Sequence, residues 1–239
     1  MLMGGFESKP APVVAPSLED TLMRNTFYFT YVFLVTTTVI TFIEAIRTKD
    51  PTVRHVMNLE TCISIVAAFF YNVFITKIKE ADDKGVEVKW GEINSTRYTD
   101  WLITTPIMLF TLCLVLASEK KKPFYFSVFI IVLLLDIGML ATGYMGEANI
   151  IDKKLGFVLG FVFFFAMYIY IWSVFMSNGK NTFVSILSYM LFMLFWAVYG
   201  LVYFADEKLK NLVYNILDLI AKALIGIFFW MYFTGVVKF

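Results

Sequence analysis

The chain places two charged residues one helical turn apart inside a long apolar run. In the stretch NILDLIAKALIGIFFW, residues 215–230, Asp218 and Lys222 are the only charged side chains. Charged groups in such a run are costly and usually mark a functional site. Lys222 lies about eleven residues, or roughly 16 Å, from either end of the helix expected over 211–233, so its side chain is too short to reach water.

The spacing of this pair indicates a specific chemistry. A lone buried ammonium tends to lose its proton, and a neutral amine is a good nucleophile towards a carbonyl carbon. Condensation with an aldehyde gives an imine, whose protonated form needs a carboxylate counterion. Asp218 precedes Lys222 by four residues, and on the same face of a helix it can supply that counterion.

A second apolar segment carries a further carboxylate and a second cation. In RYTDWLITTPIMLFT, residues 97–111, helical spacing puts Arg97, Asp100, Thr104 and Thr111 on one stripe. Together with the pair in the last helix, the segment supplies two aspartates and two cations, which allows charge to be buried without a net excess. On these residues alone, an ion-pair network with a purely structural role remains the alternative.

The composition predicts that these groups lie in a membrane protein. Hydrophobic residues make up 59% of the 239 residues and charged residues 16%, against about 25% charged in a soluble domain. The net charge of +1 argues against a nucleic-acid partner, which usually requires a basic excess. We expect no metal site.

Apolar runs long enough to cross a bilayer recur along the chain, since a spanning helix needs roughly 20 residues. Short links place successive helices side by side and antiparallel, so we expect one all-α integral membrane domain over residues 1–239, a seven-transmembrane-helix bundle that follows a polar segment at 1–20. The longest link, 77–96, contains VEVKW after the turn signal DDKG, which predicts a small hairpin. The seven expected helices are 27–46, 56–76, 98–118, 124–143, 155–176, 183–204 and 211–233.

Two motifs give the chain a resemblance to the microbial (type 1) rhodopsins over essentially all seven helices. The segment RYTDWLITTP resembles the signature of the family's third helix, and LDLIAK resembles the retinal-lysine signature of its seventh. The resemblance implies all-trans retinal bound covalently to Lys222 and isomerised by light to 13-cis. It also implies an extracellular N-terminus and a cytoplasmic C-terminus, because counts of Lys and Arg in the links do not decide the orientation.

The resemblance also assigns roles to the charged residues. Asp100 is the expected primary counterion and first proton acceptor, and Asp218 is the second counterion. Arg97 is the cation that passes charge towards the extracellular surface. Further residues are expected in the retinal pocket from family segments such as WAVYGLVY and DIGMLATG: Trp101, Thr105, Met108, Asp136, Met139, Gly143, Met167, Trp196, Tyr199 and Tyr203.

Three positions of the third helix help to sort members of this family, and here they read Asp100, Thr104 and Thr111. The acceptor Asp100 is present, but Thr111 stands where proton pumps usually carry a carboxylate donor. Glu60 on the second helix stands where the family usually has threonine, so the two residue types look exchanged. A carboxyl group in an apolar half-channel can hold a proton ready for the imine. The alternatives are that Glu60 is a hydrogen-bonded acid near the interface, or a surface residue paired with Arg54 or Lys49.

The leading hypothesis is therefore a light-driven outward proton pump rather than an enzyme. A light-gated cation channel and a photosensor without net transport are the alternatives. Lys210 stands where a proton-release glutamate is expected, and Glu147, Asp206 or Glu207 are candidate substitutes. We expect a multi-pass protein of the cell membrane whose partners are retinal, lipid, and protons or other cations. The resemblance also implies a homo-oligomer, either a trimer or a pentamer.

Overall fold

The computed structural model describes residues 18–177 and 179–237, so most of the expected polar segment 1–20 lies outside the described residues. A π-helical segment, Leu219–Leu224, joins the last two helices into one span, and a shorter one, Trp172–Met176, extends the fifth helix. A 3₁₀ turn, Val202–Phe204, follows the sixth. The helices are α1 (Leu18–Arg47), α2 (Pro51–Asp83), α3 (Trp90–Glu119), α4 (Phe126–Glu147), α5 (Lys153–Ile171), α6 (Phe183–Leu201), α7 (Glu207–Asp218) and α8 (Ile225–Phe233).

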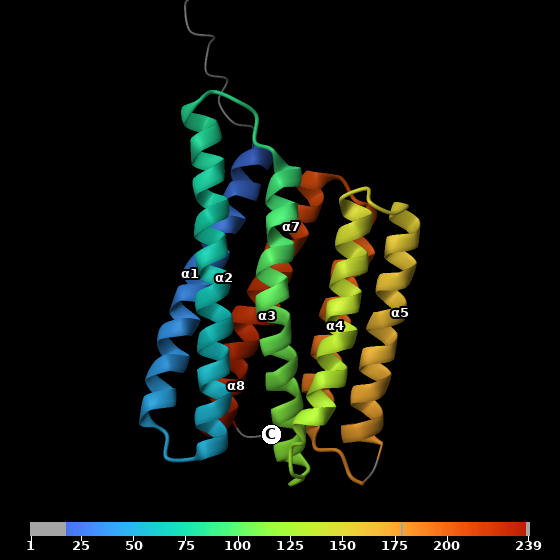
Figure 1. Cartoon of the computed structure of the whole chain (residues 1–239). Coiled ribbons are helices and arrows are strands. Elements are labelled where there is room, and N and C mark those ends of the chain that lie inside the picture. Colours follow the sequence, from blue (N-terminus) through green and yellow to red (C-terminus); the bar gives the residue numbers. More distant parts are fainter. Residues whose placement is uncertain (1–17, 178, 238–239) are drawn as a thin grey trace, which may run out of the picture.

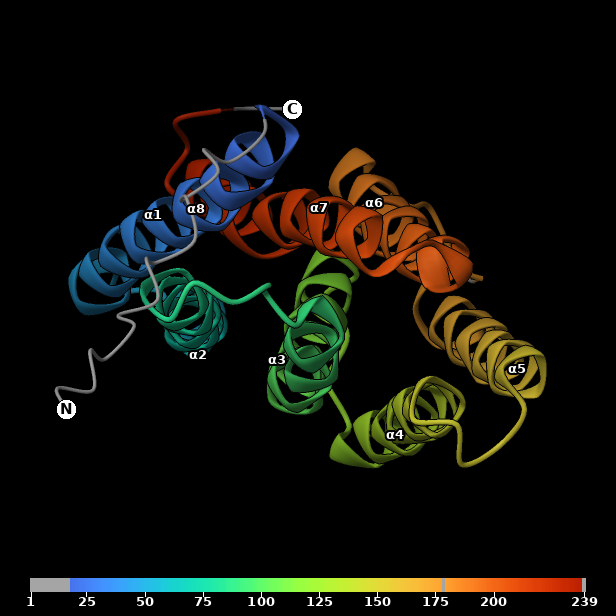
Figure 2. The same cartoon turned by 90° about the horizontal axis from the view of Figure 1, so that it is seen from above.

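These helices form a membrane bundle in which neighbours in sequence are neighbours in space. Helices α1 to α6 follow one another around the bundle, and α7 with α8 lies between α6 and α1 (Figure 2). In the part of the chain that the structure describes, seven helical spans are long and apolar enough to cross a membrane. The prediction of seven spanning helices is therefore confirmed.

The first and last spans define the two ends of the bundle. Helix α1 begins at the upper end in Figure 1, and α8 finishes at the lower end. We call these the N-terminal end and the C-terminal end of the bundle. Helices α3 and α7 begin at the N-terminal end, whereas α2 begins at the C-terminal end.

Most helices are longer than the sequence predicts. Helix α2 continues to Asp83 and α3 begins at Trp90, because polar residues at helix ends keep the backbone hydrogen-bond pattern after the apolar run stops. The hairpin prediction for VEVKW is wrong, since residues 86–89 form no strand and only link these two helices. The fourth helix starts at Phe126 rather than 124, because Tyr125 has an extended backbone and forms the N-cap.

Side-chain caps start several of the helices. Asp50 accepts hydrogen bonds from the N–H groups of Thr52 and Val53 at the start of α2. Asp152, Thr182 and Asp206 cap α5, α6 and α7 in the same way. Each cap satisfies backbone N–H groups that have no partner inside the helix, so the short links both connect and begin the spans.

Helices α4 and α5 approach closely through glycine. A Cβ atom built on Gly156 would lie 2.9 Å from the carbonyl oxygen of Thr142 and 3.0 Å from the Cα atom of Gly146. Both contacts are with backbone, which cannot rotate away. Small residues at helix contacts allow this close packing in membranes, and the glycine seam sets the spacing of the two helices.

We expect Gly156→Ala to destabilise the protein by about 1–3 kcal/mol, because the added methyl group forces the two backbones apart. Thermal unfolding in detergent, followed by circular dichroism, measures the effect. Gly91→Ala is the matched control, since its Cβ meets no atom within 4 Å. Equal unfolding temperatures for the two variants would contradict the proposed seam.

Candidate functional site

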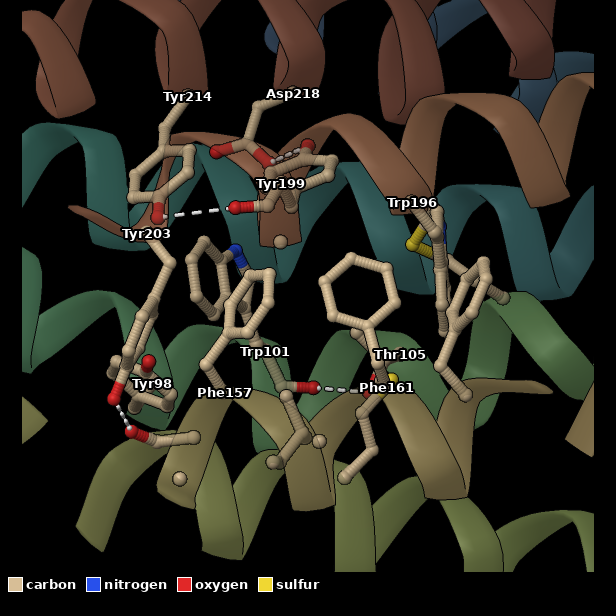
Figure 3. Close-up of a pocket in the computed structure, with 18 of the residues that line it drawn as sticks. Tyr98, Trp101, Thr105, Phe157, Phe161, Trp196, Tyr199, Tyr203, Tyr214 and Asp218 are labelled. Carbon is tan, nitrogen blue, oxygen red and sulfur yellow. Dashed lines mark hydrogen bonds between the residues drawn. The ribbon is translucent and has the colours of Figure 1, made fainter. Parts of the chain in front are cut away.

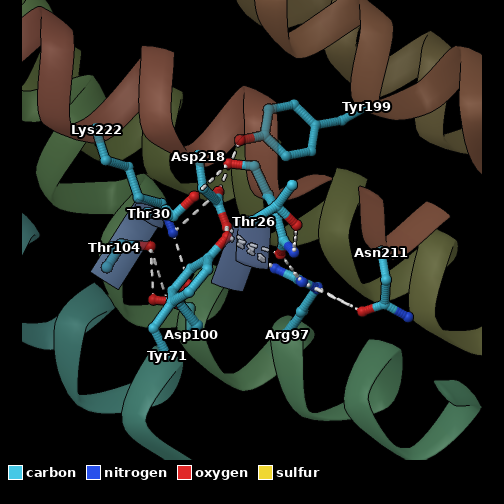
Figure 4. A network of polar contacts seen from close by, with 11 residues as sticks. Thr26, Thr30, Tyr71, Arg97, Asp100, Thr104, Tyr199, Asn211, Asp218 and Lys222 are labelled. Carbon is cyan, nitrogen blue, oxygen red and sulfur yellow. Dashed lines mark hydrogen bonds and ion pairs between the residues drawn. The ribbon is translucent and has the colours of Figure 1, made fainter. Parts of the chain in front are cut away.

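Lys222 lies in the middle of the bundle, on the π-helical segment, and is 2% exposed. Its Nζ atom lies 2.6 Å from Oδ2 of Asp100 and 3.3 Å from Oδ1 of Asp218 (Figure 4). Segments of π-helix are rare and are frequent at functional sites. The structure therefore brings together the lysine and the two aspartates that the sequence singles out.

The two aspartates have unequal surroundings. Tyr199 donates to Oδ1 of Asp218 at 2.7 Å, and Tyr71 lies 2.9 Å from Oδ2. Asp100 has the Thr104 hydroxyl at 3.3 Å and the Lys222 ammonium. Asp218 therefore accepts more hydrogen bonds from uncharged side chains than Asp100 does.

Arg97 is the second buried cation of this network. It is 0% exposed, and its Nη1 atom donates to Oδ2 of Asp218 at 3.2 Å. It also donates to the amide oxygens of Asn211 and Asn215, and its guanidinium lies 4.8 Å from the ring centroid of Phe74. Two cations and two carboxylates thus balance inside the bundle, and Arg97 continues the network towards the N-terminal end.

Several members of this network were not singled out from the sequence as site residues. Tyr71, Asn211 and Asn215 all bond to the charged groups. A signal for the two asparagines is present, because positions 211, 215, 218 and 222 repeat at helical spacing on one face. Tyr71 carries no comparable signal, since it comes from a different helix.

A cavity opens beside Lys222 between α3, α4, α5, α6 and α7 (Figure 3). Its empty volume is about 800 Å³, part of which is open to the outside. Lys222 and Asp218 line one part of it, and the rest of the wall is largely aromatic or apolar. The expected pocket residues that line it are Trp101, Thr105, Met108, Met139, Gly143, Trp196, Tyr199 and Tyr203.

Two expected pocket residues are not part of the cavity wall. Asp136 is buried behind it, with Oδ2 2.8 Å from the Thr105 hydroxyl. Met167 is 0% exposed and packs in the apolar core. Other lining residues did not stand out in the sequence, because their types are common in any apolar helix: Tyr98, Leu140, Gly156, Phe157, Gly160, Phe161, Phe164, Gly200 and Tyr214.

The cavity suits an apolar aldehyde attached to the lysine. At Gly160 a Cβ atom would meet its nearest neighbours, backbone and side-chain oxygens of α4, only at 3.8 Å. At Gly143 the nearest atom is the Tyr98 hydroxyl, at 3.4 Å. Both glycines line the cavity, so the absence of a side chain at these positions leaves more space inside it. An apolar wall with one amine and one carboxylate, and with Asp100 next to that amine, fits a long apolar group that carries a single positive charge where it joins the protein.

Glu60 and Thr111 lie outside this network. Glu60 is 2% exposed, which does not agree with the surface-residue alternative. Its carboxyl group lies against α8, where a Cβ atom on Gly226 would be 2.9 Å from Oε2. Thr111 is buried on α3 and donates its hydroxyl to the carbonyl of Ile107 at 3.0 Å. Within the described residues, neither is hydrogen-bonded to the Lys222 network.

The candidate release residues meet near the N-terminal end. Lys210 is 1% exposed and bonds to both Glu147 and Glu207. Glu207 also accepts from Asn94. Asp206 instead caps α7 by accepting from the N–H of Leu209, and the Lys210 ion pairs are made by Glu147 and Glu207.

Comparison with known proteins places this arrangement in a family. The sequence model for "Bacteriorhodopsin-like protein" matches residues 21–236. The green-light absorbing proteorhodopsin of Gamma-proteobacterium EBAC31A08 is 28% identical over 221 residues, covering 85% of this chain and 83% of that protein.

Solved structures show the same relationship. The crystal structure of the viral rhodopsin OLPVRII has 44% sequence identity and a TM-score of 0.83, covering 91% of this chain and 100% of the other. The structure of xanthorhodopsin, a light-driven ion pump with dual chromophore, shares the fold with a TM-score of 0.73 at 20% identity, covering 89% and 92%. The chain belongs to the bacteriorhodopsin-like family of microbial rhodopsins, integral multi-pass membrane proteins whose retinal chromophore is bound at a lysine.

Proposed function

We propose that the protein is a light-driven outward proton pump with all-trans retinal bound covalently to Lys222. The observation that carries the proposal is the position of the Lys222 nitrogen, 2.6 Å from Asp100 inside a buried network and next to a large apolar cavity. Xanthorhodopsin, a light-driven ion pump that shares the fold, supports the choice of a transport role.

The residues around the cavity fit this chromophore. Trp101 and Trp196 line the cavity on α3 and α6, and Thr105, Met139 and Gly143 line it on α3 and α4. When bound, retinal supplies light absorption and a light-driven change in the direction of the N–H bond at Lys222. The protein's part is to hold the nitrogen against a carboxylate and to exclude water from the cavity.

Asp100 is the proposed proton acceptor. It lies nearest to the Lys222 nitrogen and has fewer hydrogen-bond donors than Asp218. A carboxylate with fewer donors is easier to protonate. Asp218, which is bonded to Tyr71, Tyr199 and Arg97, is the proposed second counterion while the proton moves.

Arg97 gives the transfer its direction. It extends the network from Asp218 towards Asn211, near the N-terminal end of the bundle. We propose that this end faces the outside of the cell, so that a proton passed from Asp100 leaves outward. Glu147 and Glu207 around Lys210 would then lie at the exit.

Glu60 is the proposed proton donor on the opposite side. It is buried on α2 in the C-terminal half of the bundle and lies against Gly226, one turn beyond Lys222. A carboxylic acid in such surroundings favours its neutral form and can return a proton to the Lys222 nitrogen. Thr111 has no ionisable proton at useful pH, so its place on α3 does not supply one.

The covalent assignment predicts that Lys222→Ala gives no visible absorption band after all-trans retinal is added, because no other amine faces the cavity among its lining residues. Wild type should develop a band under the same conditions. Lys208→Ala is the matched control, since Lys208 pairs with Asp20 away from the cavity. A band of wild-type strength in Lys222→Ala would exclude attachment at this residue.

The pump assignment predicts that illuminated cells expressing the protein acidify an unbuffered medium, and that a protonophore abolishes the signal. Asp100→Asn should reduce the initial rate by about 10²-fold or more, as expected for loss of an essential proton acceptor. Light-induced currents that reverse sign with membrane voltage would show a cation channel instead. Absence of both signals, with an intact photocycle, would indicate a photosensor.

The donor assignment predicts that Glu60→Gln slows reprotonation of the Lys222 nitrogen by about 10²-fold, with azide restoring the rate as a soluble proton carrier. Flash photolysis measures this step as the decay of the blue-shifted species. Glu44→Gln, at a half-buried position of α1 towards the same end, is the control. An unchanged decay in Glu60→Gln would remove Glu60 from the mechanism.

A further inference from the structure

Ser64 on α2 is a buried polar group that the proposed mechanism does not use. Its side chain is 0% exposed, and among the described residues its Oγ atom has no hydrogen-bond partner in the protein. Buried polar atoms nearly always have a partner, either protein or ordered water. The hydroxyl therefore indicates a place where an ordered water is bound.

The packing of α2 against the last span locates this hydroxyl. The two segments run in opposite directions and contact each other along the π-helical segment and α8. Tyr71 bonds to Asn215 at 3.1 Å, and Glu60 lies against Gly226. These two contacts fix how the residues of the two antiparallel helices are aligned. Moving the same number of residues from Glu60 along α2 and from Gly226 back along the last span brings Ser64 opposite Lys222.

The direction of the side chain agrees with this register. At 3.6 residues per turn, Ser64 lies about 40° from Glu60 and about 20° from Tyr71 around the axis of α2. All three are buried, and the other two face the last span. Ser64 thus lies on the side of α2 that faces the last span, one turn, or about 6 Å along the helix axis, from Glu60. A water can bridge polar groups that lie too far apart for a direct hydrogen bond.

The neighbouring hydroxyls are already engaged. Thr37 on α1 donates to the carbonyl of Ala223 at 3.2 Å, and Thr41 lies 2.8 Å from the hydroxyl of Thr61. Thr111 on α3 donates to its own helix. Of the hydroxyls named here, that of Ser64 is the one without a protein partner among the described residues, and it is therefore available to orient a water.

We propose that Ser64 positions an ordered water that passes a proton from the carboxyl group of Glu60 to the nitrogen of Lys222. The carboxyl O–H bond breaks as the water accepts that proton, and the water gives one of its own protons to the lone pair on the nitrogen. Glu60 is left as a carboxylate, which regains a proton from the C-terminal side. The inference rests on the proposed donor role of Glu60 and assigns the route to the interface of α2 with the last span.

The test combines kinetics with infrared spectroscopy on the full-length protein reconstituted with retinal. Ser64→Ala should slow the decay of the blue-shifted species by about tenfold, which is less than the slowing expected when the donor Glu60 itself is replaced. Azide should restore the decay rate. Ser64→Thr keeps a hydroxyl and should stay within about twofold of wild type. Ser188→Ala, which removes another buried hydroxyl without a protein partner, on α6, is the control and should leave the decay unchanged.

The infrared measurement separates a water-positioning role from a structural one. In light-minus-dark spectra, the C=O band of the Glu60 carboxyl group is the one that disappears in Glu60→Gln. This band should shift in frequency in Ser64→Ala and keep its wild-type frequency in Ser64→Thr. A water O–H band that responds to H₂¹⁸O should be lost in Ser64→Ala. If Ser64→Ala does not form pigment, Ser64→Cys removes the hydroxyl at similar volume and should show the same losses.

The outcomes distinguish this inference from the proposed function. A wild-type decay and an unshifted C=O band in Ser64→Ala, with slow decay in Glu60→Gln, would overturn the role of Ser64 and leave the pump proposal standing. No effect in Glu60→Gln would overturn the relay and the donor role together. Failure of the wild-type protein to form pigment would contradict the proposed function itself.

Discussion

The burial of one lysine charge is the constraint on which the rest of the structure depends. Lys222 lies in the middle of the bundle with both aspartates within 3.3 Å. Two carboxylates beside one ammonium would leave an excess negative charge, and Arg97 balances it. A group of four buried charges is stable only when its remaining hydrogen-bonding positions are filled, which explains the tyrosine hydroxyls and asparagine amides from three helices that surround it.

The same constraint divides the bundle into two unequal halves. Polar side chains are concentrated from Lys222 towards the N-terminal end, where Arg97 reaches Asn211. On the other side, no chain of hydrogen bonds among the described residues links Lys222 to the buried polar groups, which are Glu60, Ser64, Thr37 and Thr41. Under the proposed function, a continuous polar path on one side and a sparse one on the other would let a proton cross the Lys222 nitrogen without a permanently open channel.

Much of this arrangement could be predicted from the sequence, since charges inside apolar runs are rare and informative. Lys222, Asp218, Asp100 and Arg97 were all singled out in this way, and the structure brings them together. Helix ends could not be predicted as well, because hydropathy detects contact with lipid, whereas α2 and α3 extend beyond the apolar runs. Tyr71 is an ordinary aromatic residue in its own helix and becomes part of the site only through the packing of α2 against α7.

The cluster around Lys210 has a consequence for the timing of charge movement. The lysine lies between Glu147 and Glu207, and Asn94 also donates to Glu207. Charge-assisted hydrogen bonds of this kind are strong, so the cluster ties α3, α4 and α7 together at this end of the bundle. Under the proposed function the exit route passes this cluster, and the time at which charge leaves would depend on how readily its ion pairs exchange partners.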